Sequence, residues 1–564
     1  MTCLKPTAQG VLFTAIAIFS LLITLSMSGQ STRRHIGTSF EVTADQRVLR
    51  PSEQPCVVPL FMNFQFAHFS DTAQTFQFTP ACSGPWKKVV FQMDFSENGG
   101  VQFDRTASLY LGNTNIYFGT TPEPLPVATN TWHIERDITD YSSLLTVPQT
   151  GTIVLANCTT DCAPPYNTLN GVFTVNANLQ FYPADSQPAQ GVADMVLPLV
   201  QVNDTGGTNL PALLFLPTDQ LSTTFTFPKN VERAYLDVLS QSQSTDEQWY
   251  GCFPNDLSDI NEVYGCGNTD FRETEITIDG QPAGLAPVSP WVYTGFLPDQ
   301  WVPSPGVQTL DFVPYRVNLT PFAGMLSNGN PHTVALSVFN DDSYFAETGS
   351  LLLFLDKGSS QVTGAVVKNT LTAPSPTVTE DLHGTGTVKG TIGVKSDRSF
   401  TIAGYVNTSH GKVSTSIEQH QGFESMQKID FDTVNGTVLD QKTTVKNKVA
   451  SVTTVSGNGG SVVTHDDFSF PIDVDFIFPV SSSEFGFNVV TGQNYQIDKK
   501  IWHGGSLVRF ESVTNSAQAS DVSPASSSQR YNTFNSDGNF YDCQISSKKN
   551  VLASVSPGCA DARH

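Results

Sequence analysis

The chain has 564 residues, only 15% of which are charged, and its formal net charge at pH 7 is −22. This acidic excess argues against nucleic acid and anionic membrane surfaces as partners, because both are themselves negative. The low share of charged residues, together with many Gly, Pro and Phe residues, is typical of an extracellular all-β protein rather than a cytosolic enzyme.

An apolar segment near the N-terminus, Val11 to Met27, ends at the small-x-small site Ser26-Met27-Ser28. Residues 1–30 are therefore predicted to be a signal peptide. The segment is also nearly long enough to span a bilayer, so an uncleaved membrane anchor is the alternative. Either way we expect entry into the secretory pathway and a secreted, extracellular or vacuolar protein. Sequons that agree with this route lie at Asn157, Asn203, Asn318, Asn407 and Asn435.

Nine cysteines are present, and all but Cys3 follow the apolar segment. In an oxidising compartment the remaining even number predicts disulfides, with proximity along the chain as the only guide to their pairing. We expect no metal, because C-x2-C pairs and histidines at ligand spacing are both missing, and no cofactor. The expected disulfides join Cys56 to Cys82, Cys158 to Cys162, Cys252 to Cys266 and Cys543 to Cys559.

Short alternating strands broken by turns dominate the chain, and long segments with a period of 3.6 residues are missing. We therefore predict an all-β fold of two consecutive jelly-roll or β-sandwich domains plus a C-terminal β-rich domain. The predicted boundaries are 50–190 and 191–360 for the two sandwiches and 387–564 for the C-terminal domain, to which we assign a supporting role. Residues 361–386, rich in Pro, Ser and Thr, are predicted to be a linker, and Ser516 to Ser528 a Ser/Ala-rich loop.

The stretch FDRTASLYL, Phe103 to Leu111, has the period-two alternation of a half-buried strand and follows the turn-forming pair Gly99-Gly100. In a regular strand Asp104 and Arg105 point to opposite faces, so the protein must hold one of the two charges. Charge at this place indicates either a structural ion pair at a strand end or a catalytic site.

Three ordered blocks, which span about Pro55 to Asp356, resemble the peptide-N4-(N-acetyl-β-glucosaminyl)asparagine amidase A family, the acidic glycoamidases of plants and fungi. The first block holds FDRTASLYL, TTPEPLP and WHIERDITDYSSLL; the second holds NVERAYLDVLSQSQSTDEQWY and IDGQPAG; the third holds PWVYTGFLPDQWVPSPG and YRVNLTPFAGMLSNGNPHTVALSV. The Asp-Arg pair before an alternating strand is also similar to a segment of the bacterial peptide-N-glycosidase F, in which the Asp is the principal catalytic carboxylate.

The resemblance implies hydrolysis of the glycosylated Asn side-chain amide of N-linked glycopeptides, which releases the glycan as a glycosylamine and leaves Asp. It implies that Asp104 binds and activates water and that Glu247, from the second domain, contacts sugar hydroxyls or transfers protons. Arg105, or less readily Arg272, would orient a carboxylate or stabilise the oxyanion. Activity at acidic pH and a preference for glycopeptides over folded glycoproteins are also implied.

Carboxylates and aromatic rings are the groups that bind sugars, and several occur near these positions. Asp246, Trp249 and Tyr250 flank Glu247; the alternative is a solvated Asp-Glu turn with Trp249 buried in the core. The bacterial enzyme carries a further Glu where this chain has Ala156 and Asn157, and Glu123, framed by two prolines, is a candidate for that role. The expected substrate-binding residues are Glu123, Trp132, Asp246, Trp249, Tyr250, Arg272 and Trp291.

Two other functions remain open from the sequence. A glycoside hydrolase also uses paired carboxylates, but it cuts between sugars or leaves a sugar on Asn. A non-catalytic, secreted or cell-surface glycan-binding protein keeps the sandwiches and aromatics and forms no product. The missing later Glu is compatible with that second alternative.

Overall fold

The computed structural model describes residues 36, 41–123, 126, 129–159, 161–164, 166–184, 191–259, 266–289, 301–477, 491–503, 505–520, 523–536 and 538–561. The predicted signal peptide or anchor, residues 1–30, and Trp291 lie outside these residues. Among the residues described, no helix is both long and apolar enough to cross a membrane.

The first sandwich consists of two four-stranded antiparallel sheets, ordered β1-β8-β3-β6 and β2-β7-β4-β5. Numbered along the chain, its strands thus follow the order 1-8-3-6 and 2-7-4-5, which is that of a jelly roll. The elements are β1 (Cys56–Phe66), η1 (Phe69–Asp71), β2 (Ala73–Phe78), β3 (Trp86–Glu97), β4 (Thr106–Leu111), β5 (Thr114–Thr120), β6 (Asn130–Asp137), η2 (Thr139–Thr146), β7 (Gln149–Leu155), η3 (Tyr166–Thr168) and β8 (Phe173–Pro183).

The second sandwich repeats this strand order, with sheets β12-β19-β14-β17 and β13-β18-β15-β16, and β9 joins the first of them beside β19. Its elements are β9 (Met195–Pro198), β10 (Gln201–Val202), β11 (Thr208–Asn209), β12 (Ala212–Leu214), β13 (Leu221–Thr226), β14 (Val231–Gln243), η4 (Ser244–Gly251), α2 (Asn255–Ser258), β15 (Glu273–Ile278), β16 (Gln281–Pro287), β17 (Tyr315–Asn318), η5 (Thr320–Phe322), α4 (Ala323–Leu326), β18 (Pro331–Phe339) and β19 (Tyr344–Leu355).

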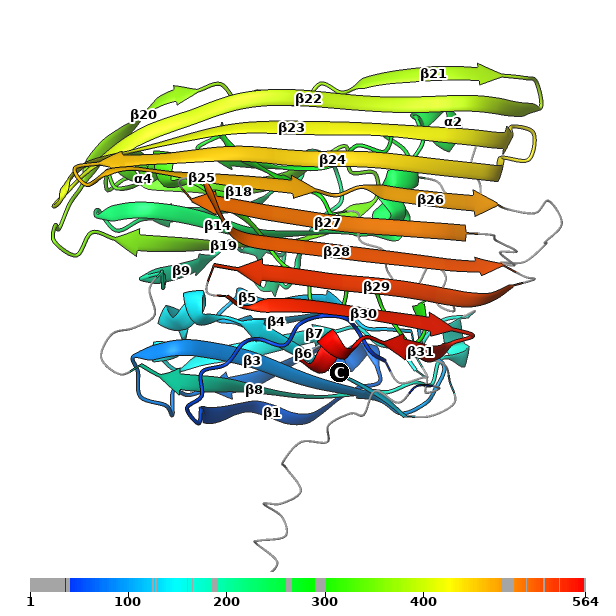
Figure 1. Ribbon diagram of the computed structural model, residues 1–564, viewed down its shortest axis with the longest axis horizontal. Helices are drawn as coiled ribbons and strands as arrows, with labels where there is room; N and C mark the ends of the chain where they lie inside the picture. The colour runs from blue at the N-terminus through cyan, green and yellow to red at the C-terminus, as the bar shows by residue number, and fades with distance from the viewer. Residues whose placement is uncertain are drawn as a thin grey trace, which may run out of the picture.

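A single twelve-stranded antiparallel sheet forms the C-terminal region and lies across both sandwiches, the second coloured green and the first blue (Figure 1). Its elements are β20 (Thr363–Asn369), β21 (Thr377–His383), β22 (Thr387–Thr408), β23 (Gly411–Asp432), β24 (Thr437–Gly457), β25 (Gly460–Ser469), β26 (Ile472–Ile477), β27 (Thr491–His503), β28 (Ser506–Ser520), β29 (Ser523–Asn535), β30 (Phe540–Lys548), β31 (Val551–Val555) and η6 (Pro557–Asp561).

Two segments expected to be irregular are strands of this sheet. The predicted linker 361–386 contains β20 and β21, which both pair with β22. The predicted loop Ser516 to Ser528 contains the end of β28 and the start of β29, which pair with each other. The linker and loop predictions fail because Ser and Thr are compatible with strands when a neighbouring strand offers a ladder of backbone partners.

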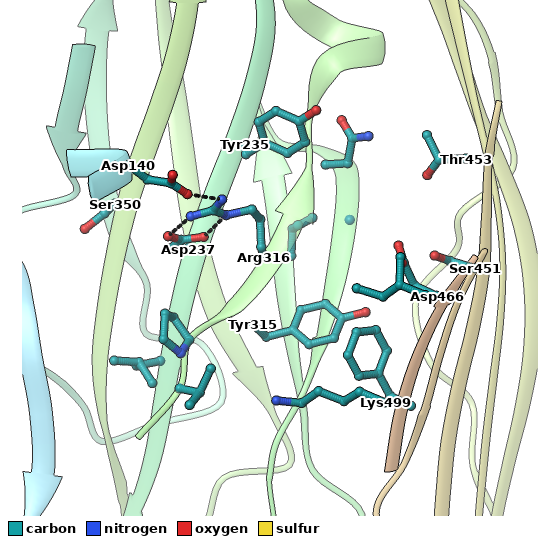
Figure 2. Close-up of a pocket in the computed structure, with 18 of the residues that line it drawn as sticks. Asp140, Tyr235, Asp237, Tyr315, Arg316, Ser350, Ser451, Thr453, Asp466 and Lys499 are labelled. Atoms are coloured by element: carbon teal, nitrogen blue, oxygen red, sulfur yellow. Dashed lines mark hydrogen bonds and ion pairs between the residues drawn. The ribbon is translucent and has the colours of Figure 1, made fainter. Parts of the chain in front are cut away.

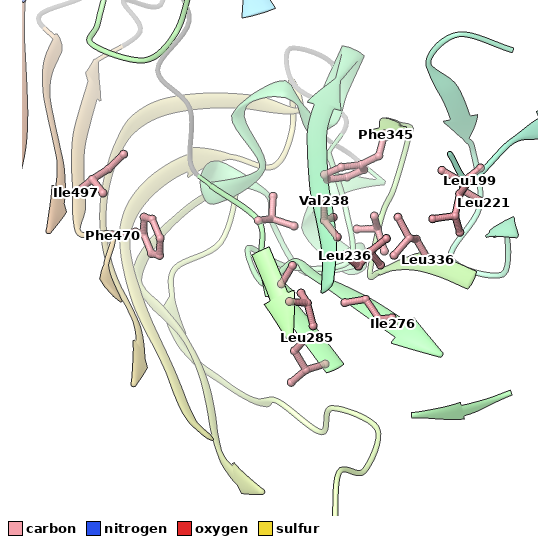
Figure 3. Packing of buried hydrophobic residues seen from close by; sticks show 14 of the residues in the cluster. Leu199, Leu221, Leu236, Val238, Ile276, Leu285, Leu336, Phe345, Phe470 and Ile497 are labelled. Carbon is pink, nitrogen blue, oxygen red and sulfur yellow. The ribbon is translucent and has the colours of Figure 1, made fainter. Parts of the chain in front are cut away.

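The hydrophobic core of the second sandwich continues into the C-terminal sheet. One cluster joins Leu236, Ile276 and Leu336 of the sandwich to Phe470 and Ile497 of the sheet, and Figure 3 shows the two groups facing each other. Burial of this apolar surface therefore stabilises the sheet and the sandwich together. All four disulfides predicted from proximity are present, so that prediction is confirmed.

Candidate active site

Alternate residues of β14 face the first sandwich and form hydrogen bonds with it. The Tyr141 hydroxyl donates a hydrogen bond of 2.7 Å to the Asp237 carboxylate. Six residues further along β14, the Gln243 side chain donates to the Thr106 hydroxyl at 3.2 Å, and this hydroxyl donates to Gln241, also at 3.2 Å. The beginning of β4 therefore lies beside the end of β14.

This contact places Asp104 and Glu247 close together, because Asp104 lies just before β4 and Glu247 follows β14 in η4. Both lie in equivalent parts of the two jelly rolls, the connection between the third and fourth strands. Asp104 stands near the end of its connection and Glu247 near the beginning of its own. Both residues are half-buried.

The charge of Asp104 acts on the Glu247 carboxyl group. Burial, and then the charge of Asp104, raise the pKa of Glu247 from 4.5 to about 8. Two neighbouring carboxyl groups disfavour simultaneous ionisation. Glu247 is therefore protonated at acidic and neutral pH and can act as a proton donor beside Asp104.

The segment that carries Asp104 is held by its own sandwich. The buried Glu97 carboxylate accepts hydrogen bonds from the backbone N–H groups of Gly99 and Gly100 at 2.9 and 2.8 Å. The Gln102 side chain donates to Asn157 at 2.8 Å and to the Gly171 carbonyl at 2.9 Å. These bonds fix the course of the chain immediately before Asp104.

Arg105 and Glu123 lie at the same site. The Arg105 Nε and Nη2 atoms donate to the Gln102 side-chain oxygen at 3.1 and 2.9 Å. Burial lowers the pKa of Arg105, and the charges of Asp104 and Glu123 oppose that change. The structure thus brings together four of the predicted residues, Asp104, Arg105, Glu123 and Glu247.

The strand predicted to carry Asp104 and Arg105 is shorter than expected. It begins at Thr106, and its residues are buried on both faces after that first position. The expected alternation between a buried and a solvated face is wrong, because β4 is an inner strand of its sheet and its outer face contacts the second sandwich. Asp104 and Arg105 lie in the preceding loop, where side chains need not alternate between two opposite faces as they do in a strand.

Asp246 and Arg272, predicted to bind substrate, form a fully buried ion pair instead. Arg272 Nε and Nη2 donate to Asp246 Oδ1 at 3.0 and 2.8 Å, and Nη1 donates to the Thr269 carbonyl at 2.7 Å. Asp246 Oδ2 accepts hydrogen bonds from the backbone N–H groups of Asp342 and Ser343 at 2.8 and 2.6 Å. This pair is part of the framework that holds η4.

The predicted aromatic platforms are core residues. Trp249 and Tyr250 are both completely buried, and Trp249 packs 6.2 Å from Phe423 of the C-terminal sheet. Trp132 is 3% exposed and stacks on Phe95, 5.0 Å away between ring centroids. The alternative interpretation of Trp249, burial in the core, is therefore the correct one, and an aromatic side chain near a site in sequence need not face it.

Other aromatic groups, which the sequence did not single out, border the site. Phe215 and Leu216, in the loop after β12, are 52% and 58% exposed. The Phe215 ring lies 5.3 Å from the half-buried Tyr344 ring. Burial, and then the charge of Glu247, raise the pKa of Tyr344, so this pair adjoins Glu247. The only signal in the sequence was an apolar pair directly before Pro217.

The predicted glycosylation sites differ in their exposure. Asn407 and Asn435 are exposed, and Asn203 and Asn318 are half-buried. Asn157 is 1% exposed, and its Nδ2 atom, to which a glycan would be attached, donates to the carbonyls of Phe66 and Gly171 at 2.8 and 3.0 Å. The folded chain leaves no room for a glycan there, so the prediction for Asn157 is wrong.

A cavity of about 840 Å³ lies apart from the paired carboxylates, between β14, β17 and the C-terminal sheet. Figure 2 shows Tyr315 and Asp466 in it, and Arg316 bonded to Asp237 and Asp140. Because Asp140 belongs to η2 and the other two to the second sandwich, these bonds join the sandwiches on the cavity wall.

One buried group of potential metal ligands, Asp246, Cys252 and Cys266, does not fit a cation. Both cysteines are in a disulfide, and Arg272 already donates to Asp246. The more exposed group is Glu232, Asp356 and His410, in which Asp356 accepts two hydrogen bonds from Ser409.

Comparison with known proteins shows the family of the chain. Residues 47–371 match the family described as Peptide N-acetyl-beta-D-glucosaminyl asparaginase amidase A. The chain belongs to this family. Membership makes it a hydrolase, a peptide-N4-(N-acetyl-β-glucosaminyl)asparagine amidase.

Three individual proteins that the chain resembles share 14–28% sequence identity with it. The peptide-N4-(N-acetyl-beta-glucosaminyl)asparagine amidase A of Prunus dulcis is 28% identical over 463 residues, which cover 78% of this chain and 77% of the relative. A crystal structure of a peptide-N(4)-(N-acetyl-beta-D-glucosaminyl)asparagine amidase has 16% identity and a TM-score of 0.36, and the match covers 53% of this chain and 96% of that one. A structure of PNGF-II has 14% identity and a TM-score of 0.36, with 54% and 65% covered.

Proposed function

We propose that Asp104 and Glu247 together catalyse hydrolysis of the side-chain amide bond of a glycosylated Asn, between the carbonyl carbon and the nitrogen that carries the glycan. The observation that carries the proposal is the pairing of the two groups, one of which, Glu247, has a pKa of about 8. Paired carboxyl groups with different affinities for protons divide the roles of base and acid between them.

In the proposed reaction Asp104 accepts a proton from a water molecule as its oxygen bonds to the amide carbon. Glu247 donates its proton to the amide nitrogen as the carbon–nitrogen bond breaks. The products are a glycosylamine and a peptide with Asp in place of Asn, and transfer of the proton from Asp104 to Glu247 through solvent restores the site. Arg105 lies beside Asp104 and Glu123 and supplies a positive charge for the oxyanion.

The substrate proposed is an N-linked glycopeptide, and Phe215 with Tyr344 is proposed to contact the apolar face of a sugar ring next to Glu247. We expect Phe215→Ala to raise KM about two- to tenfold, equivalent to about 0.5–1.5 kcal/mol for an aromatic contact, with little change in kcat. Phe215 is 52% exposed, so Tm should not change.

Phe540→Ala is the matched control for this substitution, because Phe540 is 67% exposed on β30 of the C-terminal sheet. Equal KM values for Phe215→Ala and the wild type would remove Phe215 from the substrate site.

The four disulfides support synthesis in the secretory pathway, which we propose as the route of this chain.

The decisive experiment incubates the purified chain with a defined N-glycopeptide and determines the masses of both products. We expect a peptide with Asp at the glycosylated position and a free glycosylamine. A peptide that keeps one sugar on Asn would identify a glycoside hydrolase, and binding without any product would identify a glycan-binding protein.

Asp104→Asn tests the central residue of this mechanism. It keeps the size of the side chain and removes the base, so we expect the rate to fall about 10²–10⁴-fold. Tm should remain close to that of the wild type, because Asp104 lies in a half-buried loop. Near-complete release of glycan by this variant would disprove the role of Asp104.

A further inference from the structure

The C-terminal sheet presents buried polar side chains to the second sandwich. On β23 and β24 these include Ser425, Gln427 and Gln441, which are at most 6% exposed. A buried amide or hydroxyl is costly unless it forms hydrogen bonds. The hydrogen-bond partners of these three side chains therefore indicate their role.

The two glutamines bind the end of the element that carries Glu247. Gln441 Nε2 donates to the carbonyl of Gly251, the last residue of η4, at 2.8 Å. Gln427 Nε2 donates to the carbonyl of the next residue, Cys252, also at 2.8 Å. The two side chains support each other, because Gln441 Nε2 also donates to Gln427 Oε1 at 2.9 Å.

A second set of contacts holds the same segment from the sheet. Trp249 of η4 packs against Phe423 of β23, with 6.2 Å between ring centroids. Asp270 accepts hydrogen bonds from Ser425 at 2.8 Å and from Gln427 at 3.0 Å. The chain between β14 and β15 is thus bound to β23 and β24 on both sides of the Cys252–Cys266 disulfide.

We infer that Gln427 and Gln441 of the C-terminal sheet are positioning residues for Glu247. They hold the end of η4 at a fixed place, while the Asp246–Arg272 pair holds its beginning. The carboxyl group between these two anchors is thereby kept facing Asp104. The inference rests on the proposed function, and it assigns a role in the reaction to residues beyond 371, where the match to the family ends.

Gln427→Leu in the full-length chain tests this role, and Gln441→Asn is a milder variant that keeps an amide but shortens it. Since displacement of a catalytic group by about 1 Å can cost about 10²-fold, we expect kcat to fall about ten- to a hundredfold with little change in KM. The alkaline limb of the pH profile, which Glu247 sets, should also move. Hydrogen exchange of residues 244–251 should become faster.

Gln419→Leu is the matched control. Gln419 is a buried residue on the same face of β23, and within the described residues its Nε2 atom has no hydrogen-bond partner. This variant should keep the wild-type kcat, pH profile and exchange rates.

Wild-type kcat and pH profile in folded Gln427→Leu and Gln441→Asn would overturn the positioning role. Equal losses in Gln419→Leu would overturn it too, because they would show only a general effect of changing the sheet. Full activity of Glu247→Gln is a different result, since it would remove the proposed mechanism itself, whatever the glutamine variants do.

Discussion

The connection between the third and fourth strands differs in length and in its supporting contacts between the two jelly rolls. In the first sandwich this connection is short, residues 98–105, and it is bound within its own sandwich through Glu97 and Gln102. In the second it is long, residues 244–272, with a buried ion pair, a disulfide and contacts with a separate sheet. A short loop is fixed by its strand ends, whereas a long one needs partners of its own.

The difference corresponds to the two chemical roles proposed for Asp104 and Glu247. A base such as Asp104 works when ionised and half-exposed. An acid such as Glu247 needs an environment that keeps its proton, and burial is the largest cause of its raised pKa. Glu247 lies on the longer connection, where its burial, together with the charge of Asp104, raises its pKa to about 8. The comparison can be tested by changing the acid, then its buried support, then the short connection.

Glu247→Gln is expected to have the largest effect in this series. The amide keeps the shape of the carboxyl group but cannot donate a proton to the leaving nitrogen, so kcat should fall about 10²–10⁴-fold. In the proposed mechanism the protonated form of Glu247 is the active one, so the rate of the wild type should decrease as the pH rises through about 8. The pH profile of the variant should lack this decrease, and an unchanged alkaline limb would assign it to another group.

Glu247→Gln should lower the rate but should not lower the stability at pH 8. The pKa of Glu247 in the folded chain, about 8, is above its ordinary value of 4.5. Its contribution to stability is therefore complete below about pH 4.5 and is lost as the pH rises through about 8. Glu247→Gln removes this loss, so its Tm at pH 8 should equal or exceed that of the wild type. This control separates a catalytic defect from misfolding.

Arg272→Met breaks the support of the long connection. It leaves the Asp246 carboxylate buried without its cation, so the free energy of unfolding should fall by about 3–5 kcal/mol. Arg530→Met is the matched control, because Arg530 and Asp542 form an ion pair in which both side chains are substantially exposed, and such pairs contribute about 0–1 kcal/mol. Denaturant unfolding measures both. Similar losses in the two variants would show that the buried pair has no special importance.

The sequence predicted the fold better than the site. Strand alternation was sufficient to predict an all-β fold of jelly-roll or sandwich domains, but not the strand order that makes them jelly rolls. Proximity was sufficient for all four disulfides. The equivalent placement of Asp104 and Glu247 could not be predicted, since it depends on the order of strands within each sheet. Trp132 and Trp249 were misassigned because residue type indicates that an aromatic ring will be partly buried, but not what buries it.

A supporting role for the C-terminal region was predicted, but the positioning role inferred for two of its glutamines could not be predicted from the sequence. Gln427 and Gln441 lie in strands whose alternation indicates only that one face is covered. Their partners, the carbonyls of Gly251 and Cys252, belong to another part of the chain. Backbone acceptors leave no pattern in the sequence, because every residue has one.

Gly100→Ala tests the short connection and should have the smallest effect. A Cβ atom at Gly100 would lie 2.5 Å from the backbone nitrogen of Gly171, which is too close. Because backbone cannot move aside as a flexible side chain does, residues 98–105 must shift, at a cost of about 1–3 kcal/mol. We expect a lower Tm together with a reduced kcat, since Asp104 moves with this segment.

Gly459→Ala is the control, because a Cβ atom there meets nothing within 4 Å. The comparison of the two connections also predicts how Gly100→Ala changes the pKa of Glu247. If the short segment shifts Asp104 away from Glu247, the pKa of Glu247 should fall, because one of the two causes that raise it becomes weaker. The alkaline limb of Gly100→Ala would then move to lower pH, whereas a change in stability alone would leave it in place.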